Sequence, residues 1–500
     1  MKKKVISAKL NSVWSVSSYM FSLIVLFFLF PYLIRNLGAQ KYGFYIFLAT
    51  INGIASVGNF GFAEATERYV ALYFNENNLI ALKRVLTISI LLYLAIGVLI
   101  GIIIYLFSPQ LANMIKDTGV SSADSIFLIR VSLLTFIIRF VFGIFESIPK
   151  SLQRFDISTK FLIIENIFRV SFTVFVISSG YGLSGLVFSE LLLSILSVVA
   201  NFLISVNLLG TIRLFGQFSR EILNMMFDYS IYSAMSQLVG LIWQYSDKIL
   251  LGYFVSSAAV AYFAAPQQMI FKILGLFAAG SAILFPKFSE KVITDDLRKI
   301  CEKYFLLFIS LSIIVFSTVA FVIEDFMKLW VNEQFAKQSK DIAILLAISC
   351  MVRGSFSIYE NVFKGIGKPR FNFFIILISS SILLFLNAVL IPKFGLKGAG
   401  IAYLFSPLPG LFAMFYIYRN ILMESYKKLI YDFFAPLIIG YAIIALAINF
   451  KDNLVYKTSW LYLITISGAY GLVITSVLLL LFKKYLKEFN VSFKITKNDN

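Results

Sequence analysis

Two arginine–glutamate pairs with the same spacing are the most informative charged residues of this sequence. Arg139 precedes Glu146 by seven residues, and Arg353 precedes Glu360 by the same interval. Seven residues are about two helical turns, so we expect each pair to lie on one helix face. A guanidinium group matches phosphate oxygens bidentately, which makes both arginines candidates for binding a pyrophosphate group. The alternative is that each pair serves as a gate or an interhelical salt bridge.

Polar side chains also recur at helical spacing in three apolar segments, 42–66, 222–252 and 258–285. Such a face lines a cavity or marks a place where helices pack. Lys272 favours the cavity, because a basic side chain in mid-membrane costs at least about 2.5–3.5 kcal/mol unless it meets water or a partner. The candidate substrate-binding residues are Lys272, Arg139, Arg353, Gln268, Gln244, Gln237, Asn52 and Asn59.

The absence of histidine excludes a His-based metal site and an imidazole proton relay. No nucleotide-binding loop of the GxxxxGKS or GxxxxGKT type is present either, so we expect no metal and no cofactor. The candidates for coupling or gating are Asp247, Glu146 and Glu360. For Asp247 the alternative is a permanent ion pair with Lys248 or Lys272. Glu165 and Arg169, four residues apart, are expected to neutralise each other.

The composition indicates an integral membrane protein. Apolar residues make up 59% of the chain and charged residues only 14%, against roughly 45–50% and 25% in soluble domains. Runs of about 20 mostly apolar residues predict fourteen transmembrane helices. These lie near 12–34, 42–66, 85–107, 124–148, 161–179, 183–209, 222–252, 258–285, 304–323, 341–363, 371–391, 398–418, 429–449 and 459–482.

The basic residues predict the orientation of these helices. The loops and termini on one side of the membrane contain 28 of the 44 Lys and Arg residues, including Lys2, Lys3 and Lys4 at the start of the chain and the lysines near its end. Lys and Arg accumulate in cytoplasmic loops, so both termini are expected to be cytoplasmic. This topology and attraction to anionic membrane lipid account for the net charge of +18 without any nucleic-acid partner.

The second half of the chain repeats the first. RFVFGIFESIPK at 139–150 matches RGSFSIYENVFK at 353–364, and YGLSG at 181 matches FGLKG at 394 at nearly the same offset. Six predicted spans separate the copies, so the lobes are parallel and a substrate would bind between them near the midplane. We expect an N-lobe at 1–209, a cytoplasmic linker at 210–221, a C-lobe at 222–420, and two further helices with a basic cytoplasmic tail at 421–500.

The FGLKG copy predicts a helical hairpin. Pro392 is expected to end the preceding helix, while Gly395, Gly398 and Gly400 allow a tight reversal and close packing. The YGLSG copy predicts the same hairpin in the first lobe.

Three stretches resemble a known family. These are FKGIGKPRFN at 363–372, LNAVLIPKFGLKGAGIAYLFS at 386–406, and SDKILLGYFVSSAAVAYFAAPQQM at 246–269. They look like the matching stretches of polysaccharide repeat-unit flippases of the O-antigen type, which belong to the multidrug/oligosaccharidyl-lipid/polysaccharide (MOP) exporter superfamily. The resemblance implies an all-α polytopic membrane protein with a MATE-like fold, in which two parallel six-helix lobes form a V around a central cavity and two C-terminal helices follow.

The resemblance also implies a function. A flippase of this kind moves undecaprenyl-diphosphate-linked oligosaccharide from the cytoplasmic to the outer face of a bacterial cell membrane by alternating access. A polysaccharide polymerase and the chain-length machinery would be further partners. The alternative is a cation-coupled multidrug exporter of the same fold, although the intramembrane bases suit an anionic diphosphate better.

An enzyme is the third class of protein to weigh. A membrane glycosyltransferase or polymerase would be expected to carry a large catalytic loop, but the longest connections here are under about twenty residues and lack a clustered acidic motif. A flippase breaks no covalent bond, so we expect no catalytic residues.

Overall fold

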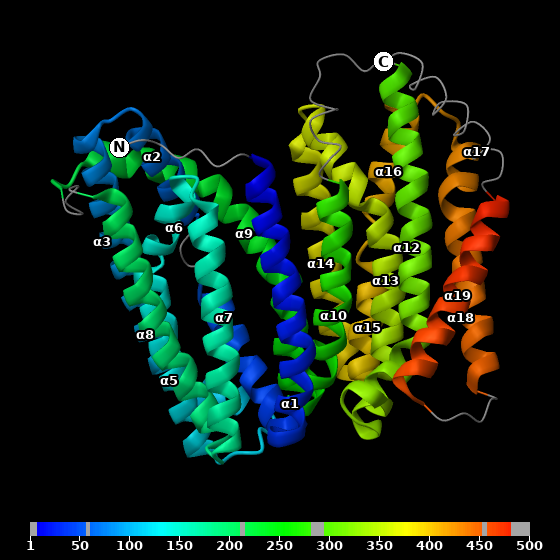
Figure 1. The fold of residues 1–500 in the computed structure, drawn as a ribbon, viewed down its shortest axis with the longest axis horizontal. Helices are drawn as coiled ribbons and strands as arrows, with labels where there is room; N and C mark the ends of the chain where they lie inside the picture. The colour runs from blue at the N-terminus through cyan, green and yellow to red at the C-terminus, as the bar shows by residue number, and fades with distance from the viewer. Residues whose placement is uncertain (1–7, 57–60, 211–215, 282–294, 453–457, 482–500) are drawn as a thin grey trace. The chain divides into compact units, whose positions relative to one another are not determined.

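The computed structural model describes residues 8–56, 61–210, 216–281, 295–452 and 458–481, and every regular element in these ranges is a helix (Figure 1). The chain forms two compact units, Met1–Ala261 and Tyr262–Asn500. The first unit contains α1 (Ala8–Ser56), α2 (Phe62–Asn75), α3 (Leu79–Leu106), α4 (Ser108–Met114), α5 (Ser122–Phe142), α6 (Ile144–Ser151), α7 (Phe155–Ser178), α8 (Gly182–Leu209) and α9 (Arg220–Phe254). Then follow α10 (Ser257–Ser281), α12 (Asp295–Trp330), α13 (Glu333–Gly365), α14 (Pro369–Phe394), α15 (Leu396–Phe405), α16 (Gly410–Asn420), α17 (Tyr426–Leu429), the π-helix η3 (Ile430–Phe434), α18 (Ala435–Asp452) and α19 (Trp460–Leu481).

Twelve helical segments of the described chain are long and apolar enough to cross a membrane. The first of them, Met20–Ser56, covers parts of two predicted spans, because the chain turns inside α1 at Gly38 with a positive φ of 78°. The predicted span 222–252 lies within α9, which has 35 residues and whose polar stripe makes it less apolar than the twelve. The predicted all-α polytopic membrane fold is confirmed.

The core of the first unit lies where α2, α3, α5 and α6 meet. Its buried side chains include Phe62, Val70, Leu82, Leu86, Phe136, Phe140, Ile144 and Ile148. Gly143 separates α5 from α6 at a turn whose hydrogen bonds span three residues instead of the four of an α-helix. The Gly143 N–H donates to the Phe140 carbonyl, and the Gly143 carbonyl accepts from the Glu146 N–H. This turn sets the direction in which the end of α5 and the start of α6 present their polar side chains.

The turn between α9 and α10 is bound to the first unit. The Lys116 N–H donates to the carbonyl of Gly252 over 3.1 Å, and the Ser257 N–H donates to the carbonyl of Lys116 over 2.8 Å. Gly43 in α1 packs directly on the Ser257 carbonyl, which would overlap any Cβ at that position. These contacts explain why the first compact unit extends past α9, although the predicted repeat assigns α9 to the second lobe. The predicted boundaries of the two lobes were drawn from the sequence repeat, and they stay a prediction.

Both predicted hairpins turn at a glycine with positive φ. Gly182 (φ 57°) begins α8, and Gly395 (φ 56°), at the matching motif position, precedes α15. Gly398 lets α15 approach α14 closely, because a Cβ there would fall 2.3 Å from the Leu390 carbonyl oxygen. The prediction that Pro392 ends the helix is wrong, since α14 continues to Phe394. A proline near a helix C-terminus removes one hydrogen bond, and it is the left-handed backbone of Gly395 that stops the helix.

The last two helices of the second unit pack on α12. Lys451 of α18 contacts Asp325 of α12 with an Nζ–Oδ2 distance of 2.7 Å, and both side chains are buried. The rings of Phe321 in α12 and Tyr470 in α19 stack with centroids 4.4 Å apart. A charge pair and an aromatic stack therefore fix α18 and α19 to the second unit.

Candidate functional site

A pocket of about 400 Å³ opens in the first unit. Its walls come from five helices, α1, α2, α3, α5 and α6, and from the turn at Gly143. The lining residues are Asn52, Gly53, Ser56, Ala63, Glu67, Tyr93, Thr135, Phe136, Arg139, Phe140, Gly143, Glu146, Ser147 and Lys150. The pocket thus combines two basic side chains, two carboxylates and several hydroxyl groups with an aromatic wall.

Three of the predicted site residues, Asn52, Arg139 and Glu146, line this one pocket. Asn52 is oriented by Ser132 of α5, whose hydroxyl accepts from the Asn52 amide over 2.8 Å. Asn59, predicted on the same stripe as Asn52, lies outside the described residues.

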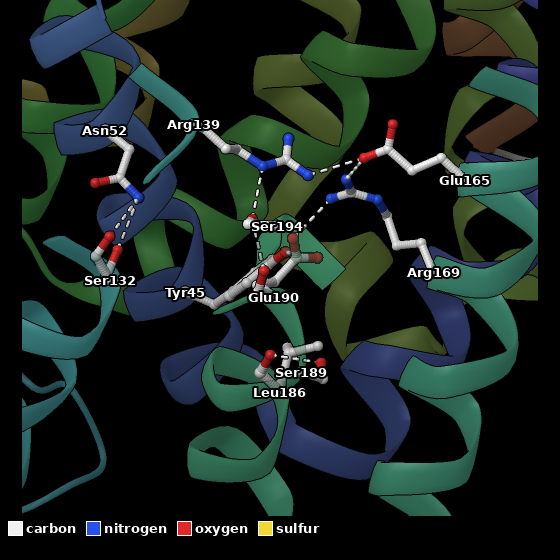
Figure 2. A network of polar contacts seen from close by, with 10 residues as sticks. All are labelled: Tyr45, Asn52, Ser132, Arg139, Glu165, Arg169, Leu186, Ser189, Glu190 and Ser194. Atoms are coloured by element: carbon white, nitrogen blue, oxygen red, sulfur yellow. Dashed lines mark hydrogen bonds and ion pairs between the residues drawn. The ribbon is translucent and has the colours of Figure 1, made fainter. Parts of the chain in front are cut away.

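Arg139 stands at the pocket wall and is anchored from two sides (Figure 2). Its Nε donates to the Ser194 hydroxyl of α8 over 2.7 Å, and its Nη2 donates to Glu165 Oε1 of α7 over 2.9 Å. The side chain remains 42% exposed. The interhelical salt bridge named as an alternative is therefore present, but its partner is Glu165 and not Glu146.

The ionic contacts continue from Glu165 away from the pocket (Figure 2). Arg169 Nη2 donates to the same Glu165 oxygen over 3.0 Å, and Arg169 Nη1 donates to Glu190 Oε2 of α8 over 2.7 Å. The Tyr45 hydroxyl of α1 donates to Glu190 Oε1 over 3.4 Å. We call Arg139, Glu165, Arg169 and Glu190 the arginine cluster. Its two cations and two anions alternate.

Glu146 turns to a local partner. Lys150, one helical turn away, donates to Glu146 Oε1 over 3.1 Å, and both side chains are well exposed. The predicted common face of Arg139 and Glu146 assumed one continuous helix, whereas the turn at Gly143 divides it. Both side chains still reach the same pocket because each lies next to that turn.

Glu67 of α2 is a pocket residue that we did not select from the sequence. It continues the helical spacing of Asn52 and Asn59, which was the available signal. Partial burial raises the pKa of the Glu67 carboxyl, Glu64 and Glu146 raise it further, and Lys150 opposes the rise.

The candidates in α9 contact other residues of the first unit. Asp247 is buried, and its Oδ1 lies 3.2 Å from Lys248 Nζ, which also donates to the Gln244 carbonyl over 2.8 Å. Gln237 Nε2 lies 3.5 Å from Glu64 Oε1 of α2. The contact between Asp247 and Lys248 has the geometry of the permanent ion pair considered as an alternative for Asp247.

The second unit contains Lys272, Gln268, Arg353 and Glu360. The Arg353 guanidinium carbon lies 5.6 Å from the ring centroid of Phe271, the residue before Lys272. Lys272 and Gln268 are both partly buried in α10. The Glu360 carbonyl accepts from Asn372 over 2.8 Å. Arg353 and the Lys272 segment thus come together within one unit, while a cavity common to Arg139, Lys272 and Arg353 stays a prediction.

Solved structures identify the fold. The structure entitled lipid II flippase MurJ, in an inward closed conformation, superposes with a TM-score of 0.71 at 16% identity, covering 96% of this chain and 100% of that one. An inward-facing multidrug resistance MATE family transporter of the MOP superfamily superposes with a TM-score of 0.59 at 16% identity, covering 84% and 96%. The predicted MATE-like fold is confirmed.

Sequence relatives cover most of the chain. An uncharacterized membrane protein of Methanocaldococcus jannaschii is 27% identical over 401 residues, which are 75% of this chain and 77% of that protein. A proposed O-antigen transporter of Shigella flexneri is 21% identical over 405 residues, covering 79% and 93%. The family described as polysaccharide biosynthesis protein matches residues 9–292. Because this match covers more than half of the chain, the protein belongs to the polysaccharide biosynthesis protein family, and its fold is that of the MOP exporter superfamily.

Proposed function

We propose that the protein flips a polysaccharide repeat unit linked to undecaprenyl diphosphate from the cytoplasmic to the outer face of a bacterial cell membrane by alternating access. The observation that carries this proposal is Arg139, a guanidinium group anchored by Glu165 and Ser194 at the wall of a pocket and still 42% exposed. A preoriented guanidinium suits a phosphate group, because its parallel N–H bonds match two phosphate oxygens. The family and the likeness to a lipid II flippase support the same substrate class.

The pocket also suits the sugar part of such a substrate. Asn52 offers amide groups, Thr135 and Ser147 offer hydroxyls, and Tyr93 and Phe136 offer ring faces and edges. Hydrogen-bonding groups beside aromatic rings are suited to a polyhydroxylated ring, which has polar edges and apolar faces. In the second unit, Lys272, Arg353 and Gln268 would contribute further contacts to the diphosphate and the sugar.

A cation-coupled multidrug exporter is the second candidate function. Two carboxylates, Glu67 and Glu146, lie in the same pocket as Arg139 and could bind a cation. A fold shared with MATE transporters is compatible with this function. The two candidates differ in the role of Arg139, which an anionic substrate requires and a cationic drug does not.

Coupling to an ion gradient belongs to the same proposal. Asp247, Glu146 and Glu360 remain the candidate carboxylates. The contact between Asp247 and Lys248 supports a structural ion pair, which would leave Glu146 and Glu360 as the coupling candidates. Both chain termini would lie in the cytoplasm, and a polymerase and the chain-length machinery would use the product on the outer face.

The experiment is to express Arg139→Gln in cells that lack the transporter and to measure surface polysaccharide together with the lipid-linked unit left on the cytoplasmic face. Export should fall about tenfold or more, because one anchored cation of the anion site is lost. Lys272→Ala should act in the same direction, and Lys272→Arg should retain partial activity because it keeps the charge.

Arg130→Gln is the matched control for Arg139→Gln. Arg130 lies on the same helix, but it donates to Ser108 and stacks on Tyr105 outside the pocket. Normal export by Arg139→Gln, or an equal loss in both variants, would contradict the role of Arg139. Loss of drug resistance with normal polysaccharide export would favour the second candidate function.

A further inference from the structure

Glu165 neutralises two arginines through a single oxygen atom. Its Oε1 accepts from Arg139 Nη2 over 2.9 Å and from Arg169 Nη2 over 3.0 Å. Arg169 has a second anionic partner in Glu190, whereas Arg139 has the Ser194 hydroxyl. Glu165 is therefore the only carboxylate among the described residues that forms an ion pair with Arg139.

Arg139 keeps donors for a ligand even while Glu165 is bound. Its Nε and Nη2 point to Ser194 and Glu165, and its Nη1 makes no hydrogen bond within the described chain. Figure 2 shows this third nitrogen directed away from both partners. A phosphate group could bind the Nη1 end of the guanidinium without first displacing Glu165.

The charge balance changes when such a ligand arrives. In the structure the arginine cluster is neutral, with Arg139 and Arg169 opposite Glu165 and Glu190. A diphosphate on Arg139 would add negative charge beside Glu165, whose side chain is only 15% exposed, and the two anions would repel each other. Glu165 would therefore weaken the hold of Arg139 on its ligand.

We infer that Glu165 is the counter-ion that allows a lipid diphosphate to leave Arg139. It balances the guanidinium while the site is empty, and it opposes tight binding while the site is filled. This role makes Glu165 a positioning residue that sets the affinity of the site, and it rests on the proposed flippase function. Without Glu165 the protein would bind its substrate too tightly to turn over quickly.

Glu165→Gln distinguishes this role from a structural brace, and Arg169→Gln gives a second expected outcome. Glu165→Gln keeps the shape and an acceptor oxygen but removes the negative charge, so diphosphate affinity should rise. Arg169→Gln removes the second cation that pairs with Glu165. Glu165 then pairs with Arg139 alone and offsets more of its positive charge, so diphosphate affinity should fall. A brace would weaken binding in both variants, because both break contacts that orient Arg139.

The test uses the full-length protein in lipid nanodiscs and undecaprenyl diphosphate without sugar as the probe. We expect Glu165→Gln to bind about fivefold to tenfold more tightly than the wild type and Arg169→Gln to bind more weakly by a similar factor. In a transport assay Glu165→Gln should lower KM and kcat together. Equal or weaker binding by Glu165→Gln overturns the inference, and so does tighter binding by Arg169→Gln.

Two further variants separate failure of the inference from failure of the proposed function. If Arg139→Gln and the wild type bind the probe equally, Arg139 is not the diphosphate site and both proposals are overturned. If Arg139→Gln weakens binding but Glu165→Gln does not tighten it, only the role of Glu165 is overturned. Should Glu165→Gln fail to fold, Glu165→Ala takes its place with the same two outcomes, because it also removes the negative charge beside Arg139. Asp156→Asn, which removes a carboxylate that pairs with Arg154 at the start of the same helix and outside the pocket, is the control for a general loss of negative charge and should leave probe binding unchanged.

Discussion

Each unit contains ion-paired side chains, and the arginine cluster of the first unit differs in exposure from the Asp325–Lys451 pair of the second. In the arginine cluster of the first unit, the Arg139 side chain is 42% exposed at the pocket. In the second unit, Lys451 is 6% and Asp325 1% exposed. Lys451 also donates to the Phe321 carbonyl over 3.0 Å and lies over the Phe321 ring, so protein groups surround it.

The difference indicates two uses for the same chemistry. A charged group at a pocket wall can exchange its protein partner for water or a ligand, so its contribution to stability is small. A charge enclosed by protein has no such exchange, and removing its partner leaves an uncompensated charge. We therefore expect variants of the arginine cluster to alter transport, and variants of the Asp325–Lys451 pair to alter folding.

The largest effect is expected from breaking the Asp325–Lys451 pair. Asp325→Leu should lower the free energy of unfolding in detergent by about 3–5 kcal/mol, because Lys451 is left buried without its carboxylate. Adding Lys451→Met should restore much of the loss by removing the stranded charge. Lys397→Met is the control in the same unit, since Lys397 pairs with Asp341 at the surface and its loss should change stability little. A similar small effect for Asp325→Leu would show that the arginine cluster and the Asp325–Lys451 pair do not differ in this way.

A substitution of Asp247 tests whether the Asp247–Lys248 pair in α9 serves transport or stabilises the fold. The Asp247 carboxylate is buried and pairs with Lys248, so we expect it to stabilise the fold as Asp325 does. Asp247→Asn should destabilise the fold, by less than Asp325→Leu because the amide still accepts a hydrogen bond. The remaining transport in vesicles should stay dependent on an imposed pH gradient. Slow transport independent of the gradient would instead assign coupling to Asp247 and move it to the functional class.

The smallest effect is expected at Glu67, a half-buried pocket residue. Its raised pKa means that the folded state holds the Glu67 proton more tightly than the unfolded state does. Glu67 therefore adds stability at pH values below its ordinary pKa of 4.5, and this stability is lost as pH rises through the folded pKa. The midpoint temperature of thermal unfolding, measured from pH 4 to 7, should fall less steeply with rising pH in Glu67→Gln than in the wild type. An unchanged slope would place Glu67 in contact with bulk water.

Local spacing predicted those parts of the site that lie on one helix or one hairpin. The Glu165–Arg169 contact is such a pair, and the glycine turns at Gly182 and Gly395 are encoded in the two short motifs. The partners of Arg139 were not predicted, because Glu165 and Ser194 belong to other helices and no periodicity connects them to α5.

The turn at Gly143 was missed for a different physical reason. A glycine in an apolar run is compatible with a continuous helix, so nothing in the local pattern indicated that α5 and α6 would separate there. The break at Gly143 changes the relative directions of the Arg139 and Glu146 side chains, so their seven-residue spacing alone does not determine whether they form an ion pair.

The enclosed Lys451 has a consequence for the biosynthesis of the chain. Lys451 follows its contact residue Phe321 by 130 positions, so a ribosome needs roughly ten seconds to reach it after Phe321 has been added. During that interval Lys451 is not yet present to pair with Asp325. Lys328, in the same helix as Asp325, is a basic residue that is already present, and in the folded protein its Nζ lies 3.9 Å from Asp325 Oδ1. The neighbouring Glu324 is held by Lys340 as soon as α13 emerges. Insertion of α18 thus brings the buried partner of Asp325 into place, before α19 adds its aromatic contact to α12.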